Sequence, residues 1–137
     1  MSKPITGGCH CGAVRYTAAA EPLMGGHCYC TTCQKLSGAG HASHVAFPEP
    51  AVTVTGPVAT YACQADSGAT VTSGFCRTCG SPVWGRSSGM PGMVTVRATS
   101  LDEPARFVPQ LAVFTRSARS WDPPPAGLPA FAAMPPM

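Results

Sequence analysis

Three short cysteine motifs decide the fold of this chain: Cys9-His10-Cys11, Cys28-Tyr29-Cys30-Thr31-Thr32-Cys33 and Cys76-Arg77-Thr78-Cys79. Structural zinc is held by four protein ligands, whereas catalytic zinc has three and leaves one position for water or substrate. The first and third motifs together supply four cysteines, and the second motif supplies three. The sequence therefore predicts one zinc that holds the domain together and a second zinc that can perform chemistry.

The four-cysteine site would join distant parts of the chain. Cys9 and Cys11 lie too far in sequence from Cys76 and Cys79 for a compact zinc finger. Gly12 and Gly80, which follow the two pairs, suit tight backbone turns around a metal. The alternative for the third motif is a redox pair of the thioredoxin type, which requires a βαβ context that this sequence lacks. We therefore interpret the four residues as a structural zinc site.

The three-cysteine site can form from a turn and the first turn of a helix. A fourth protein ligand would close it, and the candidates are His27, His41, His44 and Cys63. His27 adjoins Cys28, so the two side chains can rarely reach one ion. His41 and His44 cannot share a strand face, because their spacing breaks the two-residue period. Cys63 stands alone and is most simply a small buried apolar residue.

The composition fits one domain, residues 1–137, with a thin core. A length of 137 residues corresponds to a single domain. Gly and Pro number 15 each and fall between short apolar runs, which predicts frequent turns. A turn-rich chain with few large aromatic residues depends on cross-links such as metal sites for stability.

Charge and hydropathy exclude several partners. The net charge is +3, the basic residues are scattered, and the pI of 8.5 is below the value of about 9 typical of nucleic-acid-binding domains. No apolar stretch approaches the roughly 18 residues of a membrane span. The N-terminus lacks the apolar segment of a secretory signal. We expect a cytoplasmic protein, where clustered cysteines favour metal binding or catalysis over disulfides.

The apolar runs predict a mostly antiparallel all-β domain, because they are short, rich in β-branched residues and bracketed by Gly or Pro. The expected strands are 13–17, 44–47, 52–55, 70–72, 82–84, 93–97 and 111–114, with a turn at Asp66-Ser67-Gly68. One short helix is expected from Thr31 to Leu36, closed by Ser37-Gly38. The prolines at 123–125 and 135–136 predict an extended C-terminal tail from about residue 121.

The ligand set narrows the chemistry of the second site. Three thiolates on Zn²⁺ leave a net charge of −1, so the metal should acidify water less than a three-histidine site does. This favours sulfur-ligand exchange and thiol activation over hydrolysis. A zinc deaminase would need a catalytic Glu in H-x-E and a P-C-x-x-C motif. Here position 12 is Gly and position 75 is Phe, so the deaminase interpretation fails.

The order of the motifs resembles the glutathione-dependent formaldehyde-activating enzyme family, which includes the centromere protein V domain. The resemblance lies in residues 7–16, 27–38 and 75–82, and extends to Trp121 and to 127–131. It implies a zinc-stapled antiparallel β-tent fold with two Zn²⁺ per chain. It also implies a structural zinc on Cys9, Cys11, Cys76 and Cys79 and a catalytic zinc on Cys28, Cys30 and Cys33.

The resemblance further implies an activity that joins formaldehyde to glutathione and is classed as a carbon–sulfur lyase. The expected product is S-hydroxymethylglutathione, and the expected partner is a small thiol such as glutathione. The sequence departs from the family at three positions, with Tyr29 where His is common, Gln34 where a basic residue is frequent, and Leu111 where His is often found. None of these changes removes a zinc ligand.

The mechanistic hypothesis is that the open zinc position binds the substrate sulfur as a thiolate, to which an electrophilic carbon adds or from which it leaves. Candidate groups for handling protons are His27, Tyr29 and the polar residues near Ser37, and Lys35 can offset the negative charge of the site. Two alternatives stay open. One is a non-enzymatic zinc-stabilised binding module with a closed fourth position, and the other is a redox or metal-buffer role. The oligomeric state is not determined by the sequence.

Overall fold

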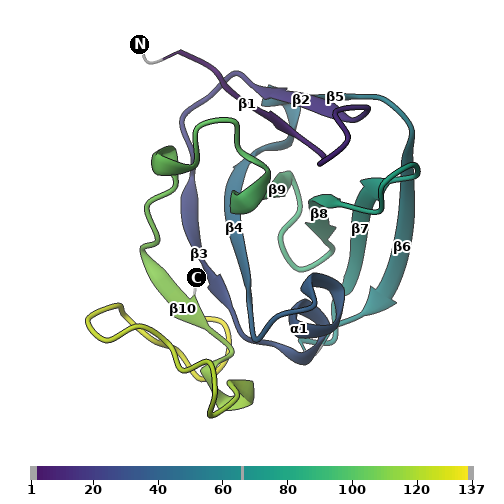
Figure 1. Ribbon diagram of the computed structural model, residues 1–137. Coiled ribbons are helices and arrows are strands. Elements are labelled where there is room, and N and C mark those ends of the chain that lie inside the picture. The colour runs from purple at the N-terminus through teal and green to yellow at the C-terminus, as the bar shows by residue number, and fades with distance from the viewer. Residues whose placement is uncertain (1–2, 66, 136–137) are drawn as a thin grey trace.

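The computed structural model of the protein describes residues 3–65 and 67–135. Asp66 of the expected turn and Pro136 of the expected tail lie outside these residues. Within them, ten strands form two sheets (Figure 1). The three-stranded sheet has the order β1-β2-β5 and consists of β1 (Ile5–Gly8), β2 (Arg15–Ala18) and β5 (Val52–Thr55).

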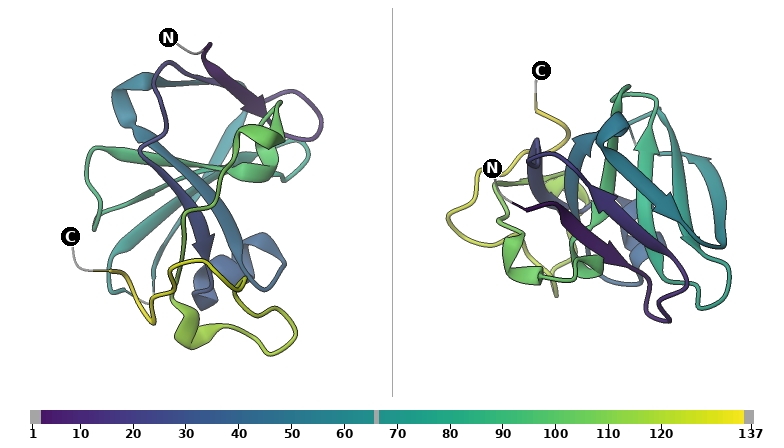
Figure 2. Two further views of the ribbon diagram at one scale, coloured as in Figure 1. Left: turned by 90° about the vertical axis from the view of Figure 1, so that its left-hand side faces the viewer. Right: turned by 90° about the horizontal axis from the view of Figure 1, so that it is seen from above.

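The larger sheet has seven strands in the order β10-β3-β4-β9-β8-β7-β6. These strands are β3 (Met24–Cys28), β4 (Ala42–Pro48), β6 (Val58–Gln64), β7 (Thr70–Cys76), β8 (Pro82–Ser87), β9 (Met93–Arg97) and β10 (Leu111–Val113). One α-helix, α1 (Thr31–Ser37), and four short 3₁₀ helices, Glu49–Ala51, Ala98–Ser100, Pro104–Arg106 and Thr115–Ser117, complete the described chain. Figures 1 and 2 show the smaller sheet over one end of the larger sheet and α1 near the opposite end.

The two faces of the larger sheet have different roles. Val45 and Phe47 of β4 and Val94 and Val96 of β9 are at most 3% exposed and belong to one apolar core together with residues of the smaller sheet, such as Tyr16. Because successive side chains of a strand point to opposite faces, the residues between them face away from this core. The register pairs His44 with Arg97 and Ala46 with Thr95 on that second face.

The prediction of a mainly antiparallel β domain with one short helix is confirmed. Gly38 ends α1 in the left-handed conformation, at φ 73°, as the sequence predicted for a helix closed by Ser37-Gly38. One strand pair departs from the antiparallel pattern, because β10 lies parallel to β3. The sequence missed β1 and β3, whose glycine pairs lower β-propensity, and also β6 at the sheet edge.

The segment after residue 121 lies beside β10. Ala112 donates its backbone N–H to the carbonyl of Pro129, and Phe131 donates to the carbonyl of Ala112, both at 2.9 Å. These residues therefore cover the outer edge of β10, which would otherwise present unpaired backbone groups. No helix in the described chain is long and apolar enough to cross a membrane.

Candidate metal centres

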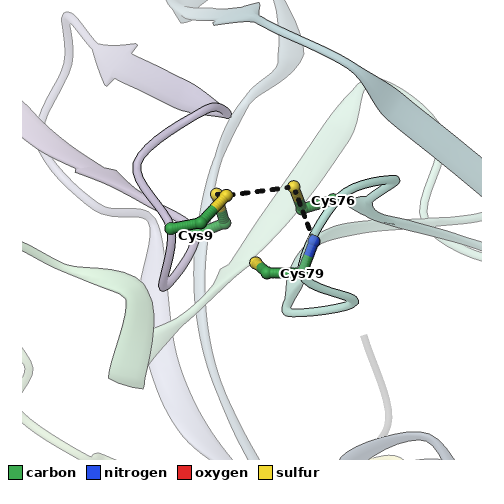
Figure 3. Close-up of side chains that lie close together, drawn as sticks. Cys9, Cys76 and Cys79 are labelled. Atoms are coloured by element: carbon green, nitrogen blue, oxygen red, sulfur yellow. Dashed lines mark hydrogen bonds between the residues drawn. The ribbon is translucent and has the colours of Figure 1, made fainter.

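The structure brings the four cysteines of the first and third motifs together. Cys9 and Cys11 lie in the turn between β1 and β2, Cys76 ends β7, and Cys79 lies in the turn before β8. The four sulfurs all lie within 4.8 Å of one another, with Cys9–Cys11 at 3.6 Å and Cys11–Cys76 at 3.7 Å. Figure 3 shows the side chains of Cys9, Cys76 and Cys79 converging from these two turns. A tetrahedral zinc with Zn–S bonds of about 2.3 Å separates its sulfurs by about 3.8 Å, so this donor set fits zinc.

Hydrogen bonds support negative charge on these sulfurs. Cys9 Sγ accepts from the backbone N–H of Val14 at 3.2 Å, and Cys76 Sγ accepts from Thr78 at 3.3 Å. The hydroxyl of Ser81 lies 3.2 Å from Cys79 Sγ and lowers the pKa of Cys79 to about 5. Such N–H and O–H donors orient metal-bound thiolates and stabilise their charge.

Glycines shape both turns. Gly12 and Gly80 have φ values of 84° and 80°, in the left-handed region that a residue with a Cβ rarely adopts. They therefore allow the backbone to turn around the sulfur cluster, as the sequence predicted from their position after Cys11 and Cys79.

The second motif forms a three-sulfur cluster. Cys28 ends β3, Cys30 is the N-cap of α1, and Cys33 lies in the first turn of the helix. Their sulfurs lie within 4.8 Å of one another, and Cys30 Sγ accepts from the backbone N–H of Cys33 at 3.2 Å. Hydrogen bonds from Cys28 and then Cys33 lower the pKa of Cys30 to about 3, whereas the contact with Cys30 raises the pKa of Cys28 to about 12.

No other described His, Cys, Asp or Glu joins this cluster as a fourth ligand. His44 comes nearest, with Nε2 at 3.5 Å from Cys33 Sγ, but it is not within 4.8 Å of all three sulfurs. His27 binds Ser43 through Nδ1 at 2.8 Å, and His41 binds Asp122 through Nδ1 at 2.5 Å. Cys63 lies on the edge strand β6, paired with Val71. None of the four sequence candidates therefore lies within 4.8 Å of all three sulfurs.

A cavity of about 350 Å³ adjoins the three-sulfur cluster. It lies on the face of the larger sheet that points away from the core, and its floor includes the small residues Gly26, Ala46 and Gly85. Methionines and other apolar side chains form much of its wall, and all three cysteines line it. An apolar cavity of this size with a few convergent polar groups is typical of small-molecule sites.

The predicted proton-handling groups differ in their relation to this cavity. His27 lines it, and its ring packs edge-to-face on His41 at 4.9 Å. Tyr29 is 1% exposed, packs on the same His41 ring and does not line the cavity. Ser37 Oγ donates to the carbonyl of His41 at 3.1 Å, also outside the cavity lining. Lys35 is exposed.

Gln34 and Leu111 are two of the three residues that depart from the family pattern, and the structure shows what each contacts. Gln34 donates from Nε2 to the carbonyls of Tyr29 and Ser117, at 2.8 and 2.9 Å, and so ties the helix to the chain after β10. Leu111 lines the cavity.

Sequence reasoning missed Arg97 as a cavity residue, and it named His44 only as a possible fourth ligand. Burial and then the positive charge of Arg97 lower the pKa of His44 to about 3, so its ring is neutral at pH 7. The signal that could have found them is the alternation along 93–97 and 44–47, which places Arg97 and His44 on the face opposite the valines and Phe47.

Comparison with known proteins agrees with this arrangement. Residues 4–117 match the family described as "Glutathione-dependent formaldehyde-activating enzyme". The chain belongs to this family. The match covers all seven clustered cysteines, and it confirms the resemblance predicted from the motifs.

A Halomonas elongata protein named "Putative glutathione-dependent formaldehyde-activating enzyme" is 31% identical over 103 residues, which are 72% of this chain and 66% of that protein. The chain thus spans just under two thirds of the length of this relative. The crystal structure of a Rhodobacter sphaeroides protein has a similar fold, with a TM-score of 0.59 and 19% identity over 92% of this chain and 98% of that chain.

The two clusters predict the metal content. We expect two zinc ions per chain in protein purified without chelator, because both donor sets consist of thiols at metal-binding separations. Cys63→Ala should retain both ions, since Cys63 belongs to neither cluster. Elemental analysis of fresh, reduced protein measures this. One ion or fewer in the intact chain, or loss of one ion in Cys63→Ala, would contradict the assignment.

The clusters should differ in what they stabilise. Cys76→Ser should unfold or strongly destabilise the domain, because structural zinc contributes about 10–16 kcal/mol in small domains, comparable to their whole net stability of about 5–15 kcal/mol. Cys30→Ser should leave the fold largely intact and empty only the second site. Thermal unfolding followed by circular dichroism compares the two variants, and equal losses of Tm would show that the division is wrong.

Proposed function

We propose that this chain is a zinc-dependent carbon–sulfur lyase that acts on thiol–aldehyde adducts such as S-hydroxymethylglutathione. The observation that carries the proposal is the three-sulfur cluster, which lines a cavity and has no fourth protein ligand among the described residues. The four-sulfur cluster, by contrast, already supplies a full tetrahedral set. Family membership supports the same reaction class.

Zinc held by Cys28, Cys30 and Cys33 would supply a Lewis acid with one position for a substrate sulfur, which it would favour in the thiolate form. In the lyase direction, the carbon–sulfur bond of the adduct breaks and its electron pair stays on sulfur. The hydroxyl proton leaves as the carbonyl of the aldehyde forms. The reverse reaction joins thiol and aldehyde without any oxidant or reductant.

The side chains around the cluster suit this reaction. The floor of small residues, Gly26, Ala46 and Gly85, leaves room for the adduct, and the apolar wall limits water at the reacting sulfur. His27 lies between Gly26 and Cys28 on β3, so its ring points to the opposite face, where it bonds Ser43 and packs on Phe107. Of the three proton-handling candidates from the sequence, only His27 contributes to the cavity lining, through the strand that carries it.

The cysteines also support a proposal for the cellular compartment in which the protein works. All eight are free, and seven lie in two tight clusters. Thiols at this density persist in a reducing environment. The proposal therefore includes the cytoplasm as the place where the protein works. A binding module, the alternative from the sequence, would need a closed fourth position, and no further described His, Cys, Asp or Glu lies within 4.8 Å of all three sulfurs.

Exchange NMR on glutathione and formaldehyde tests the activity. We expect intact protein to speed exchange between the free compounds and the S-hydroxymethyl adduct. Cys30→Ser should reduce exchange to the protein-free rate, because it removes a ligand of the open site. Cys63→Ser, a matched change outside both clusters, should retain the intact rate. If intact protein gives the protein-free rate with glutathione and with every other small thiol tested, the lyase proposal fails.

A further inference from the structure

Arg97 is a buried cation that faces the cavity. It ends β9, pairs in register with His44, lines the cavity and is only 7% exposed. Arginine stays charged under all ordinary conditions. A charge removed from water to this extent is costly unless an anion or several hydrogen-bond acceptors compensate it.

No described carboxylate supplies that anion. No described Asp or Glu forms an ion pair with Arg97, and none lines the cavity. Its guanidinium makes no hydrogen bond to a described residue. The second arginine of the cavity, Arg86, is different: its Nε lies 2.9 Å from Glu49 Oε1, its guanidinium packs on Trp84, and its side chain is 49% exposed. Arg97 therefore has no carboxylate partner among the described residues, whereas Arg86 pairs with Glu49.

Arg97 and the three cysteines line the same cavity. Zinc held by three thiolates would carry a net charge of −1, which would offset part of the charge of Arg97. A guanidinium offers five N–H donors, arranged to match a carboxylate. An oxygen anion bound to Arg97 would share the cavity with a sulfur held at the cluster.

We propose that Arg97 binds a carboxylate of the substrate, and that the enzyme therefore selects thiols that carry a carboxylate. This inference rests on the proposed function, because it requires the substrate sulfur to lie at Cys28, Cys30 and Cys33. Glutathione and smaller mercaptocarboxylates share the chemistry that Arg97 would recognise. Neutral thiols and aminothiols lack it.

Isothermal titration calorimetry on zinc-loaded protein tests the inference with a matched ligand pair. 3-Mercaptopropionate and 3-mercaptopropanol have the same thiol and chain length and differ in the carboxylate. We expect the carboxylate to bind at least about tenfold more tightly, the effect of a charge-assisted hydrogen bond. Arg97→Gln should abolish this difference while the affinity for 3-mercaptopropanol stays unchanged. Arg86→Gln should keep the difference, because Glu49 already pairs with Arg86.

Arg97→Lys extends the test if the Gln variant fails to fold. It keeps the charge but loses the paired donors, so we expect a reduced preference that is still measurable. Glutathione is the third ligand whose binding is measured. Binding of glutathione that depends on Arg97 would identify the tripeptide as the source of the carboxylate, and dependence confined to 3-mercaptopropionate would identify a shorter acid. Either result supports the carboxylate contact.

Three results would overturn the inference. Equal binding of the two matched ligands by intact protein would remove it and leave the lyase proposal standing. Equal weakening of both ligands in Arg97→Gln would show that Arg97 only offsets the charge of the sulfur cluster. Binding of no thiol at all would contradict the proposed function itself, and with it the role of Arg97.

Discussion

The structure depends on the convergence of four sulfurs from two turns that are distant in sequence. The β1–β2 turn belongs to the smaller sheet, and the β7–β8 turn belongs to the larger one. A metal held by Cys9, Cys11, Cys76 and Cys79 would cross-link the two sheets at one end of the molecule. A domain with a thin core gains most from such a constraint, because its burial of apolar surface barely exceeds the entropy cost of folding.

The two faces of the larger sheet belong to the core and to the candidate site. One face packs on the apolar core, and the other face forms the floor of the cavity. The three-sulfur cluster lies where β3 passes into α1, at the wall of this cavity. Cross-strand pairing then places His44 and Arg97 on the cavity face without any contribution from loops. The site is therefore held by the same strands that form the core.

Much of the fold and of the two cysteine clusters could be predicted from the sequence, because metal-binding cysteines occur at characteristic short spacings. Their grouping, the glycine turns at Gly12 and Gly80, and the short helix carrying Cys33 all follow from local chemistry. The parallel pairing of β10 with β3 could not be predicted, because nothing in residues 111–113 specifies a partner. The strands with glycine pairs were missed for a physical reason. A Cβ at Gly7 would meet Tyr16, and a Cβ at Gly26 would meet Leu111, so close packing requires glycines that in the sequence alone indicate turns. The burial of Arg97 could not be predicted, because it depends on the neighbours of Arg97 in space.

The central claim is that the cluster of Cys28, Cys30 and Cys33 leaves one metal position open to a substrate sulfur. X-ray absorption at the zinc edge measures this directly, because it gives the mean number of sulfur ligands per ion. Four sulfurs on one zinc and three on the other predict a mean of 3.5 for the protein alone. Saturation with a thiol substrate should raise the mean to 4. A mean that starts at 4, or that stays at 3.5 with saturating thiol, would contradict the account.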